Sequence, residues 1–443
     1  MYNSINIATM NSTNWRAVFL LPLCFIFSIN AWSQFTMTGE IRPRAEFRQG
    51  FKTLREYGTE PAMFVEQRSR LYTNFHQEKI TMHLAIQDVR IWGSVDQIYK
   101  QDPNLQNVFE AYGQYDFTKK FALKVGRTAL DYDDARFLGN LDWAQQSRSH
   151  DVLQFRFNNK ENDIKADAGL AWNQNWLTEP TKLDGNFYDH SITNNYKTMQ
   201  YIWFNKKWEK SFISLIFLND GMQVPADSSM VNRQSYGLHT EKEMGKLKLR
   251  FEGYYQGGNN LKKQDIDAYL LSFWFTYKTK LTPVTIGADY VSGTEKNGTD
   301  DHSFNPLFGT NHKFYGYMDY FYVGSPHRQG TENSSGLIDL FAKTKWKVAK
   351  KAALVADVHY FMSPVSIIDP SDTTQTMNAT LGTELDLVLV WKPQNDVVMY
   401  FGYSEMFATE TMNVIKPGNG LLSDNRWAWI MIAIKPTLFS TAP

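Results

Sequence analysis

The chain has 443 residues and a formal net charge of zero, because 46 Lys and Arg residues balance 46 Asp and Glu residues. This balance argues against a dedicated nucleic-acid binder, and the single Cys excludes a disulfide framework or a cysteine-based zinc site. A mean hydropathy of −0.43 argues against a helical membrane bundle, although 15% of the residues are aromatic.

The N-terminus has the pattern of an export signal. Residues 17–29 read AVFLLPLCFIFSI, follow Arg16 and are too few to span a bilayer. Ala31 and Ser33 occupy the small-residue positions of a signal-peptidase site. The sequence therefore predicts export from the cytoplasm and cleavage after Ser33.

This interpretation divides the chain into a signal peptide over residues 1–33 and a single mature domain over 34–443, which contains no cysteine. The alternatives are a hydrophobic N-terminal helix and lipidation at Cys24. Translation from either Met1 or Met10 is compatible with the signal.

The mature chain alternates between apolar and polar residues from its start. In residues 35–48 (FTMTGEIRPRAEFR) the odd positions are mostly apolar and the even positions carry Thr, Glu and Arg. Successive side chains of a strand point to opposite faces, so one face is apolar and the other charged. Fourteen residues is long for a soluble sandwich strand and suits a tilted strand that crosses a membrane.

The same pattern predicts 18 strands, with no later run of 18 apolar residues that would form a transmembrane helix. The predicted ranges are 35–48, 63–76, 79–92, 106–117, 119–132, 150–158, 163–175, 196–207, 210–219, 233–243, 246–258, 264–279, 281–293, 333–346, 351–362, 378–393, 395–408 and 425–437.

The connections between these strands alternate in length. Long loops such as 133–149 and 294–332 follow odd-numbered strands, and short polar turns such as 206–210 follow even-numbered ones. Outer-membrane barrels have this arrangement, with short periplasmic turns and long extracellular loops. The sequence predicts an all-β, transmembrane antiparallel barrel in a Gram-negative outer membrane. The long aromatic loop 294–332 is expected either to constrict the mouth or to cap it.

Aromatic residues near strand ends fit the girdles that mark membrane interfaces. The candidates are Tyr115, Trp172, Trp203, Trp208, Tyr277, Trp346, Trp391, Trp427 and Trp429.

The charged strand faces are expected to line an aqueous lumen, as in porins of this size. Candidate pore-lining or substrate-binding residues are Arg42, Arg44, Arg48, Arg68, Arg70, Lys124, Lys248, Arg250, Glu40, Glu46, Glu384 and Asp386. Guanidinium groups suit carboxylate ligands, and rings of Arg or Lys select anions in pores. The alternative is that these arginines pair with Glu40, Glu46 and Glu66 as a structural ladder.

Several segments resemble the alginate-export family of outer-membrane β-barrels. They are QRSRLYTNF (67–75), QDVRIWG (87–93), GRTALDYDDARFLGNLDW (126–143), FNPLFGTNHKFYGYMDYFYVG (304–324), GTELDLVLVWKP (382–393) and FGYSEMF (401–407). The resemblance implies an 18-stranded porin that passes acidic (uronate) polysaccharide or other anionic solutes through an arginine-rich lumen. It also implies roles for the arginines that match basic positions in the family: Arg42, Arg44, Arg68, Arg70, Arg90, Arg127 and Arg136.

Few residues indicate any other chemistry. Asp131, Asp133, Asp134 and Asp142 make a calcium site conceivable, but their spacing fails the EF-hand pattern and pairing with arginines is the better interpretation. The chain lacks the H-E-x-x-H, G-x-S-x-G and phosphate-loop motifs, so we expect no catalytic residues, no cofactor and no metal.

The expected partners are outer-membrane lipid and anionic polysaccharide or small anionic solutes, with periplasmic export components as a further candidate and nucleic acid excluded. The expected function is passive diffusion or export of such solutes. A general porin without polysaccharide selectivity, and a barrel-embedded enzyme or surface-binding protein, are the alternatives.

Overall fold

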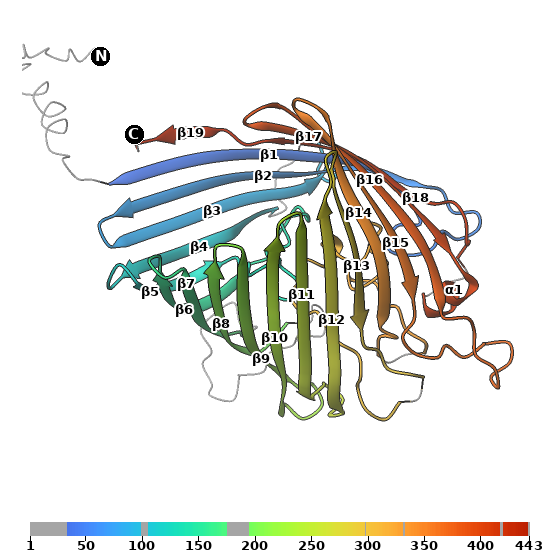
Figure 1. The fold of residues 1–443 in the computed structure, drawn as a ribbon. Coiled ribbons are helices and arrows are strands. Elements are labelled where there is room, and N and C mark those ends of the chain that lie inside the picture. Colours follow the sequence, from blue (N-terminus) through green and yellow to red (C-terminus); the bar gives the residue numbers. More distant parts are fainter. Residues whose placement is uncertain are drawn as a thin grey trace, which may run out of the picture.

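The protein folds as a closed antiparallel β-barrel, seen in a computed structural model that describes residues 33–98, 105–174, 195–296, 298–330, 333–416 and 420–441. Strands that follow one another in the chain are neighbours in the sheet, and β1 pairs with β18 to close the ring (Figure 1). In the closing pair Ile41 faces Ile434, and Ala45 faces Ile430. The predicted 18-stranded all-β barrel is confirmed. The predicted signal peptide, apart from Ser33, lies outside the described residues.

The strands follow the predicted ranges closely. Their bounds are β1 (Gln34–Gln49), β2 (Ala62–Gln77), β3 (Ile80–Ile91), β4 (Gln106–Asp116), β5 (Phe121–Thr128), β6 (His150–Asn159), β7 (Ile164–Trp172), β8 (Thr198–Trp208), β9 (Ser211–Gln223), β10 (Met230–Met244), β11 (Leu247–Asn259), β12 (Asp265–Lys278), β13 (Pro283–Val291), β14 (Leu337–Ala349), β15 (Ala352–Met362), β16 (Thr380–Gln394), β17 (Val397–Ala408) and β18 (Asn425–Ile434). The short β19 (Thr437–Ser440) follows β18 and also pairs with β1.

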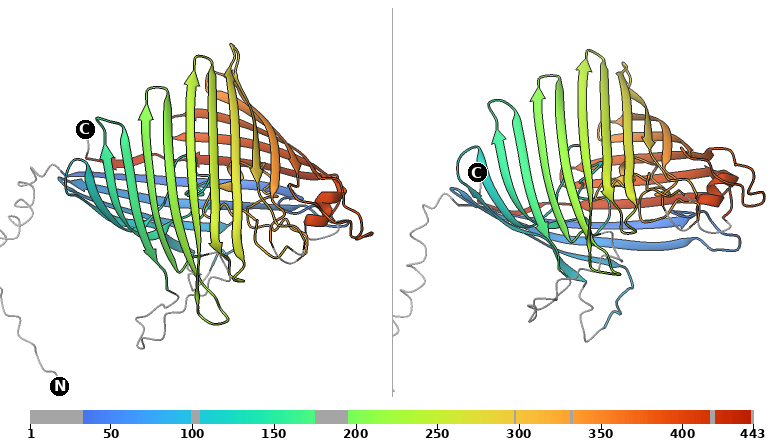
Figure 2. Two further views of the ribbon diagram at one scale, coloured as in Figure 1. Left: turned by 60° about the horizontal axis from the view of Figure 1, so that its bottom comes forward. Right: turned by 90° about the horizontal axis from the view of Figure 1, so that it is seen from below.

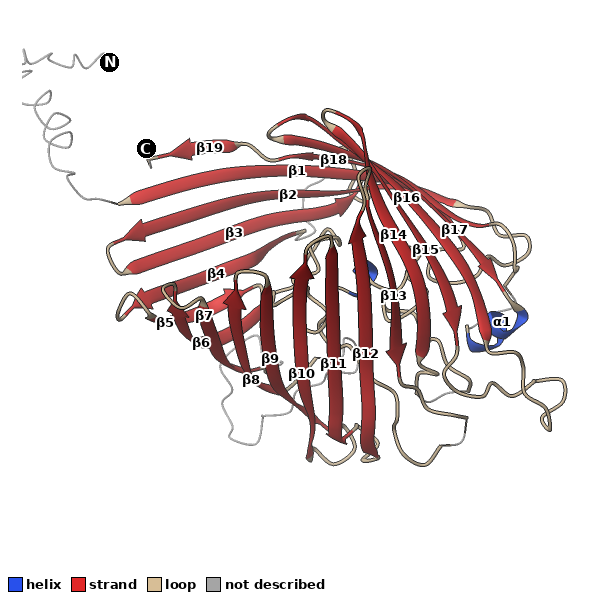
Figure 3. Ribbon diagram, in the orientation of Figure 1, coloured by secondary structure: helices blue, strands red, loops and turns tan. Residues whose placement is uncertain are grey.

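Within the described residues, helical structure is confined to the loops. It consists of the 3₁₀ turn η1 (Asn311–Lys313) and the helix α1 (Glu410–Ile415), drawn in blue in Figure 3. In the described ranges, no helix has the length and apolar character needed to cross a membrane.

One predicted strand ends earlier than expected. The alternation suggested a strand over 119–132, but β5 stops at Thr128. There the Ala129 N–H donates to the Glu110 carboxylate at 2.9 Å, and the chain turns into the lumen, where Leu130 is buried. Alternation alone cannot show this exit, because an inward-folded loop also carries apolar residues.

Adjacent side chains in the wall have opposite environments. In β12, Leu270 is fully buried whereas Leu271 is 39% exposed, because the first faces the lumen and the second faces outward. Exposed aromatic residues on the outer face include Trp172, Trp208, Trp346 and Trp391, as predicted for an interfacial girdle.

Three members of the predicted girdle instead face inward. Trp203, Trp427 and Trp429 are buried in the lumen, which corrects the interpretation of these residues as interfacial. Trp427 donates from its indole N–H to the Glu46 carboxylate at 2.8 Å. The alternation of these strands places the three rings on the same face as the charged residues.

A charged residue on the outer face should destabilise the barrel more, the closer it lies to the middle of the bilayer. We expect Leu271→Arg, at the middle of β12, to lower the free energy of unfolding by about 2–4 kcal/mol, and Tyr277→Arg, near the turn on the same face, by about 0–1 kcal/mol. Urea unfolding in lipid vesicles, followed by tryptophan fluorescence, measures both. Equal losses would show that position 271 does not lie at the membrane centre.

Candidate functional site

Two long loops fold into the lumen and join there. Residues 129–149 connect β5 to β6, and residues 292–336 connect β13 to β14. The Gly139 N–H donates to the Phe308 carbonyl (2.9 Å), and the Thr310 N–H donates to the Ala135 carbonyl (2.8 Å). In both views of Figure 2 the yellow and orange loop segments lie between the green strands and the red strands. We call these segments loop A (129–149) and loop B (292–336).

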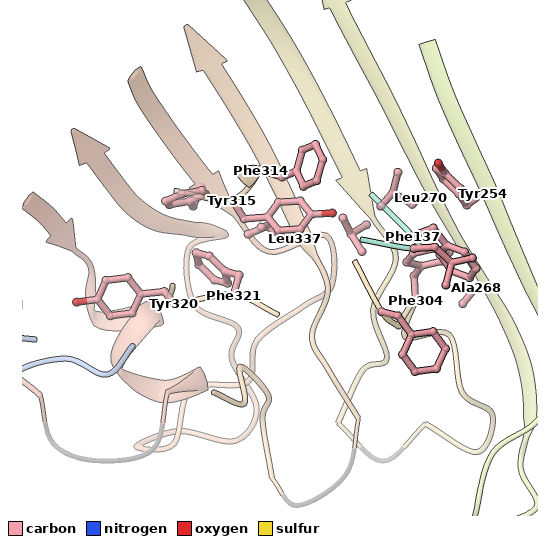
Figure 4. Packing of buried hydrophobic residues seen from close by; sticks show 14 of the residues in the cluster. Phe137, Tyr254, Ala268, Leu270, Phe304, Phe314, Tyr315, Tyr320, Phe321 and Leu337 are labelled. Atoms are coloured by element: carbon pink, nitrogen blue, oxygen red, sulfur yellow. The ribbon is translucent and has the colours of Figure 1, made fainter. Parts of the chain in front are cut away.

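Aromatic side chains of the two loops pack against the inside of the wall. Figure 4 shows Phe304, Phe314, Tyr315 and Phe321 of loop B and Phe137 of loop A, together with wall residues such as Leu270. All five aromatic rings are 2% exposed or less. Of the two expectations for the 294–332 loop, the structure therefore shows an inward constriction rather than a cap.

Three arginines of β1 and β2, Arg44, Arg48 and Arg68, form an ion-pair ladder with acids of the same two strands. Register places Glu40 opposite Arg70 and Arg44 opposite Glu66. Arg44 donates to Glu46 at 2.8 Å and also contacts Glu66, and Arg68 donates to Glu40 at 3.1 Å. Candidate residues Arg42, Arg44, Arg68, Arg70, Glu40 and Glu46 are thus brought together, each at most 5% exposed.

Loop A covers this ladder. Arg68 donates to the Asp142 carboxylate at 2.9 Å, Arg42 donates to Gln145 at 3.1 Å, and the Arg44 guanidinium lies 4.2 Å from the ring centre of Trp143. Burial by itself would raise the pKa of Asp142, but the charges of Arg68 and Arg42 outweigh it and hold that pKa below its ordinary value. The ladder is consequently neutralised and shielded rather than exposed to a passing solute.

Arg136 fastens loop A to the opposite wall. Its guanidinium donates to Glu252 of β11 (3.0 Å), to Asp289 of β13 (2.6 Å) and to Ser272 of β12 (3.0 Å). The side chain is 1% exposed, and the same group lies over the ring of Phe314 in loop B. Burial lowers the pKa of Arg136, but the two carboxylates more than reverse this effect, so the group stays charged.

Two candidate acids hold loop B through its backbone. Glu384 accepts from the Met318 N–H at 2.8 Å, and Asp386 accepts from the Tyr317 N–H at 3.4 Å. Both acids are buried on β16. They therefore act as anchors for the constriction in this structure.

The remaining candidates divide between the lumen and the outer face. Arg48 bonds to Glu46, Lys124 bonds to Thr128, Lys248 pairs with Glu241, and Arg250 contacts Glu252, all on inward-facing positions. Arg90 and Arg127 lie on the outer face near the loop end, where they pair with Asp88 and Asp151. The register places Arg90 on the outer face, which corrects the expectation that it lines the lumen. Alternation puts Arg127 on the face opposite Lys124, but its side chain borders the cavity at the loop end.

The acids of loop A do not converge on a calcium-like site. Asp133 accepts from Trp203 and Ser214, Asp142 binds Arg68, and Asp131 accepts from Asn140. Their carboxylates point to different parts of the wall and loop, as expected for residues paired with neighbours.

A buried lysine stands at the end of α1. Lys416 is 2% exposed, and its ammonium donates to Ser325 of loop B at 2.8 Å and to the Tyr320 carbonyl. Burial, with some repulsion from Lys52, lowers the pKa of Lys416 to about 7. No local sequence pattern indicates a role for this residue, because its partners lie about ninety residues earlier in the chain.

This lysine predicts a pH dependence of stability. Unfolded Lys has a pKa of about 10.4, so between pH 7 and 10 the unfolded chain binds a proton that the folded chain does not. The free energy of unfolding should therefore rise with pH across that window and stay flat for this group below pH 7. Urea titrations at pH 7 and pH 9 test this, and Lys416→Met should remove the difference whereas the exposed Lys280→Met should keep it.

The comparisons with known proteins agree with this architecture. The family model described as alginate export matches residues 33–428. No curated protein sequence matches the chain. Among solved structures, OccAB4 of Acinetobacter baumannii is 11% identical with a TM-score of 0.58, and the match covers 92% of this chain and 99% of that one.

Two Pseudomonas aeruginosa structures are similarly close in fold. OccK9 (OpdG) is 9% identical with a TM-score of 0.59, covering 91% of this chain and 98% of its own. OpdK, solved with vanillate, is 9% identical with a TM-score of 0.57, covering 90% and 98%. These likenesses establish the porin fold, and the family model establishes the relationship in sequence. The chain belongs to the alginate export family and is an outer-membrane β-barrel channel.

Proposed function

We propose that the barrel carries anionic solutes, including acidic (uronate) oligo- or polysaccharide, across the outer membrane by passive diffusion. The observation that carries this proposal is a cavity of about 710 Å³ at the turn end of the lumen. Its charged lining consists of the cations Lys79, Lys119, Lys120, Arg156, Lys160 and Lys165 and the anions Glu78, Asp116 and Asp167. Cations outnumber anions two to one, which favours anions at this mouth.

A second cavity at the loop end also favours anions. It measures about 420 Å³ and is lined by Lys52 and Arg148, with the Arg127–Asp151 pair at its rim. Arg148 donates to the Gly309 carbonyl at 3.1 Å, and burial lowers its pKa to about 10, so it is still charged at neutral pH. A carboxylate group of a sugar acid would find a guanidinium and an ammonium here.

Strand β6 connects the two cavities. His150 lines the loop-end cavity and Arg156 lines the turn-end cavity, and both face inward. Between them Gln154 donates to the hydroxyl of Tyr132 (3.0 Å), which in turn donates to Asp167 at 2.9 Å. Loop A thus places a tyrosine between the two cavities. A solute that follows this basic side of the lumen has to displace it.

Single-channel recording in planar bilayers tests the proposal. We expect the wild-type channel to prefer anions under a KCl gradient, and oligouronate to reduce its current. The double variant Arg156→Gln/Lys165→Gln should move the permeability ratio towards unity. Lys263→Gln removes the same charge as Lys165→Gln from an exposed loop position and serves as the control.

Cation preference in the wild type would overturn the proposal. Anion preference without any effect of oligouronate would support the alternative of a general porin without polysaccharide selectivity. A barrel closed to ions under all conditions would support a non-transport role, such as a surface-binding barrel or an enzyme. Lipid of the outer membrane and periplasmic export components are the partners that such a channel would need.

A further inference from the structure

Loop A brings an aspartate next to a histidine and a glutamate of the wall. His239 of β10 and Glu252 of β11 are directly opposite each other in the strand register, and both side chains face the lumen. The His239 Nε2 atom lies 3.8 Å from Glu252 Oε1. Asp134 of loop A completes the group, in which one ligand atom from each residue lies within 4.8 Å of the other two.

The histidine lacks hydrogen-bond partners although it is buried. His239 is 4% exposed, and neither of its ring nitrogens has a hydrogen-bond partner among the described residues. Buried polar atoms are almost always satisfied, so an imidazole without hydrogen-bond partners that faces two carboxylates is an arrangement suited to binding a cation. The ring itself is held in place by Phe212, whose ring centre lies 4.8 Å away at an angle of 85°.

The carboxylates around the cluster outnumber the cations that contact them. The carboxylates in and beside the cluster belong to Asp133, Asp134, Glu252 and Asp289. The cations that contact these residues in the described part of the chain are Arg136, Arg250 and Lys313. One negative charge remains, which a bound metal ion can neutralise.

We propose that Asp134, His239 and Glu252 bind a divalent transition-metal ion of the zinc class. One imidazole and two carboxylates, with a fourth position left for water, are a ligand set that zinc takes, whereas calcium and magnesium prefer oxygen ligands alone. The ion ties loop A to β10 and β11. It thereby fixes the constriction from a point separate from the Arg136 contacts with Asp289 and Ser272.

Arg250 competes with a metal ion for the carboxylate oxygens of this site. Arg250 contacts both Asp134 Oδ2 and Glu252 Oε1, and the second of these oxygens is the one 3.8 Å from His239 Nε2. The same guanidinium lies 4.4 Å from the ring centre of Trp274, which gives it a second partner when a metal takes the oxygens. Glu252 Oε2 keeps its 3.0 Å bond to Arg136, so metal binding does not require that contact to break.

Metal titration of the full barrel in detergent tests the site. After treatment with EDTA, we expect one Zn²⁺ per chain by calorimetry, and one Co²⁺ with an absorption spectrum typical of mixed nitrogen and oxygen ligands. His239→Gln should weaken binding by about tenfold or more, whereas His302→Gln, at an exposed loop histidine, should leave it unchanged. Arg250→Met should tighten binding, because it removes the competitor while keeping a side chain of similar length.

Three outcomes would overturn the proposal: no stoichiometric Zn²⁺ uptake by the wild type, equal affinity in His239→Gln, or weaker binding in Arg250→Met. The first would leave His239 as a packing neighbour of Glu252 and Phe212 alone. Heat-modifiable gel mobility of every variant shows that the barrel has folded before binding is compared. None of these measurements depends on which solute the channel carries.

Discussion

Arg136→Met is expected to lower the free energy of unfolding by about 3–5 kcal/mol, because it leaves the buried Asp289 without its cation and takes one of two from Glu252. Glu252 and Asp289 are fully buried and take 3.0 Å and 2.6 Å bonds from this one guanidinium. Methionine keeps most of the length and apolar contact of the side chain, including packing on Phe314, so the loss reports mainly on charge. Urea unfolding in vesicles measures the change.

The control is Arg127→Met, which makes the same substitution nine positions earlier. Arg127 pairs with Asp151 at 3.3 Å, but the two side chains are 45% and 58% exposed. An exposed ion pair contributes about 0–1 kcal/mol, so this variant should differ little from the wild type. A similar loss in both variants would mean that Arg136 acts through packing alone.

A second readout separates stability from constriction. Adding Asp289→Asn to Arg136→Met removes the orphaned charge, because Glu252 keeps its contact with Arg250, and should recover part of the lost stability. Channel conductance should rise in both variants, because loop A loses its fastening to β11, β12 and β13. A double variant that regains stability while its conductance stays high would show that the ion pair of Arg136 with Asp289, rather than the mere presence of loop A, keeps the lumen narrow.

The barrel could be predicted from the sequence because each strand carries its own signal. The alternation around Leu270 and Leu271 reports which face is inside without any knowledge of neighbouring strands, and the alternating loop lengths give the topology. The arginine concentration on β1 and β2 was likewise visible. The pairing of these arginines with Glu40 and Glu66 was one of the two interpretations that the sequence left open, and the structure shows this pairing.

The constriction could not be predicted in the same way, because its contacts join distant parts of the chain. Arg136 meets Asp289 across 153 positions, and Lys416 meets Tyr320 across 96. Nothing in the local sequence of β10 indicates that His239 would face Asp134. The resemblance singled out Arg136 as a basic position in a shared segment, but its role as a fastener required the fold.

Excision of most of loop B is expected to open the channel while preserving the barrel. Ser303 Oγ donates to the Ser334 carbonyl at 2.7 Å, so the two ends of the segment already lie side by side. Two glycines can therefore replace residues 304–333 without moving β13 or β14. The deletion removes the buried aromatic residues of loop B, and conductance in planar bilayers should increase several-fold.

The same deletion should change ion preference. Glu384 and Asp386 lose the N–H groups of Met318 and Tyr317 and become exposed to the water that fills the lumen. Two carboxylates exposed on this wall favour cations, so the permeability ratio should shift away from anions even as the total current rises. Glu384→Gln/Asp386→Asn in the deleted channel should reverse that shift.

A matched deletion shows whether the effect belongs to loop B. Residues 370–374 form the exposed tip of the loop between β15 and β16, whose ends meet through a 3.0 Å bond from the Asp369 N–H to the Gln375 carbonyl. Replacing this tip with two glycines should leave both conductance and ion preference unchanged, because it does not enter the lumen. If the deletion of 304–333 likewise left the current at the wild-type level, loop B would not be the barrier. The narrow point would then be Tyr132 of loop A, which stands between the two basic cavities.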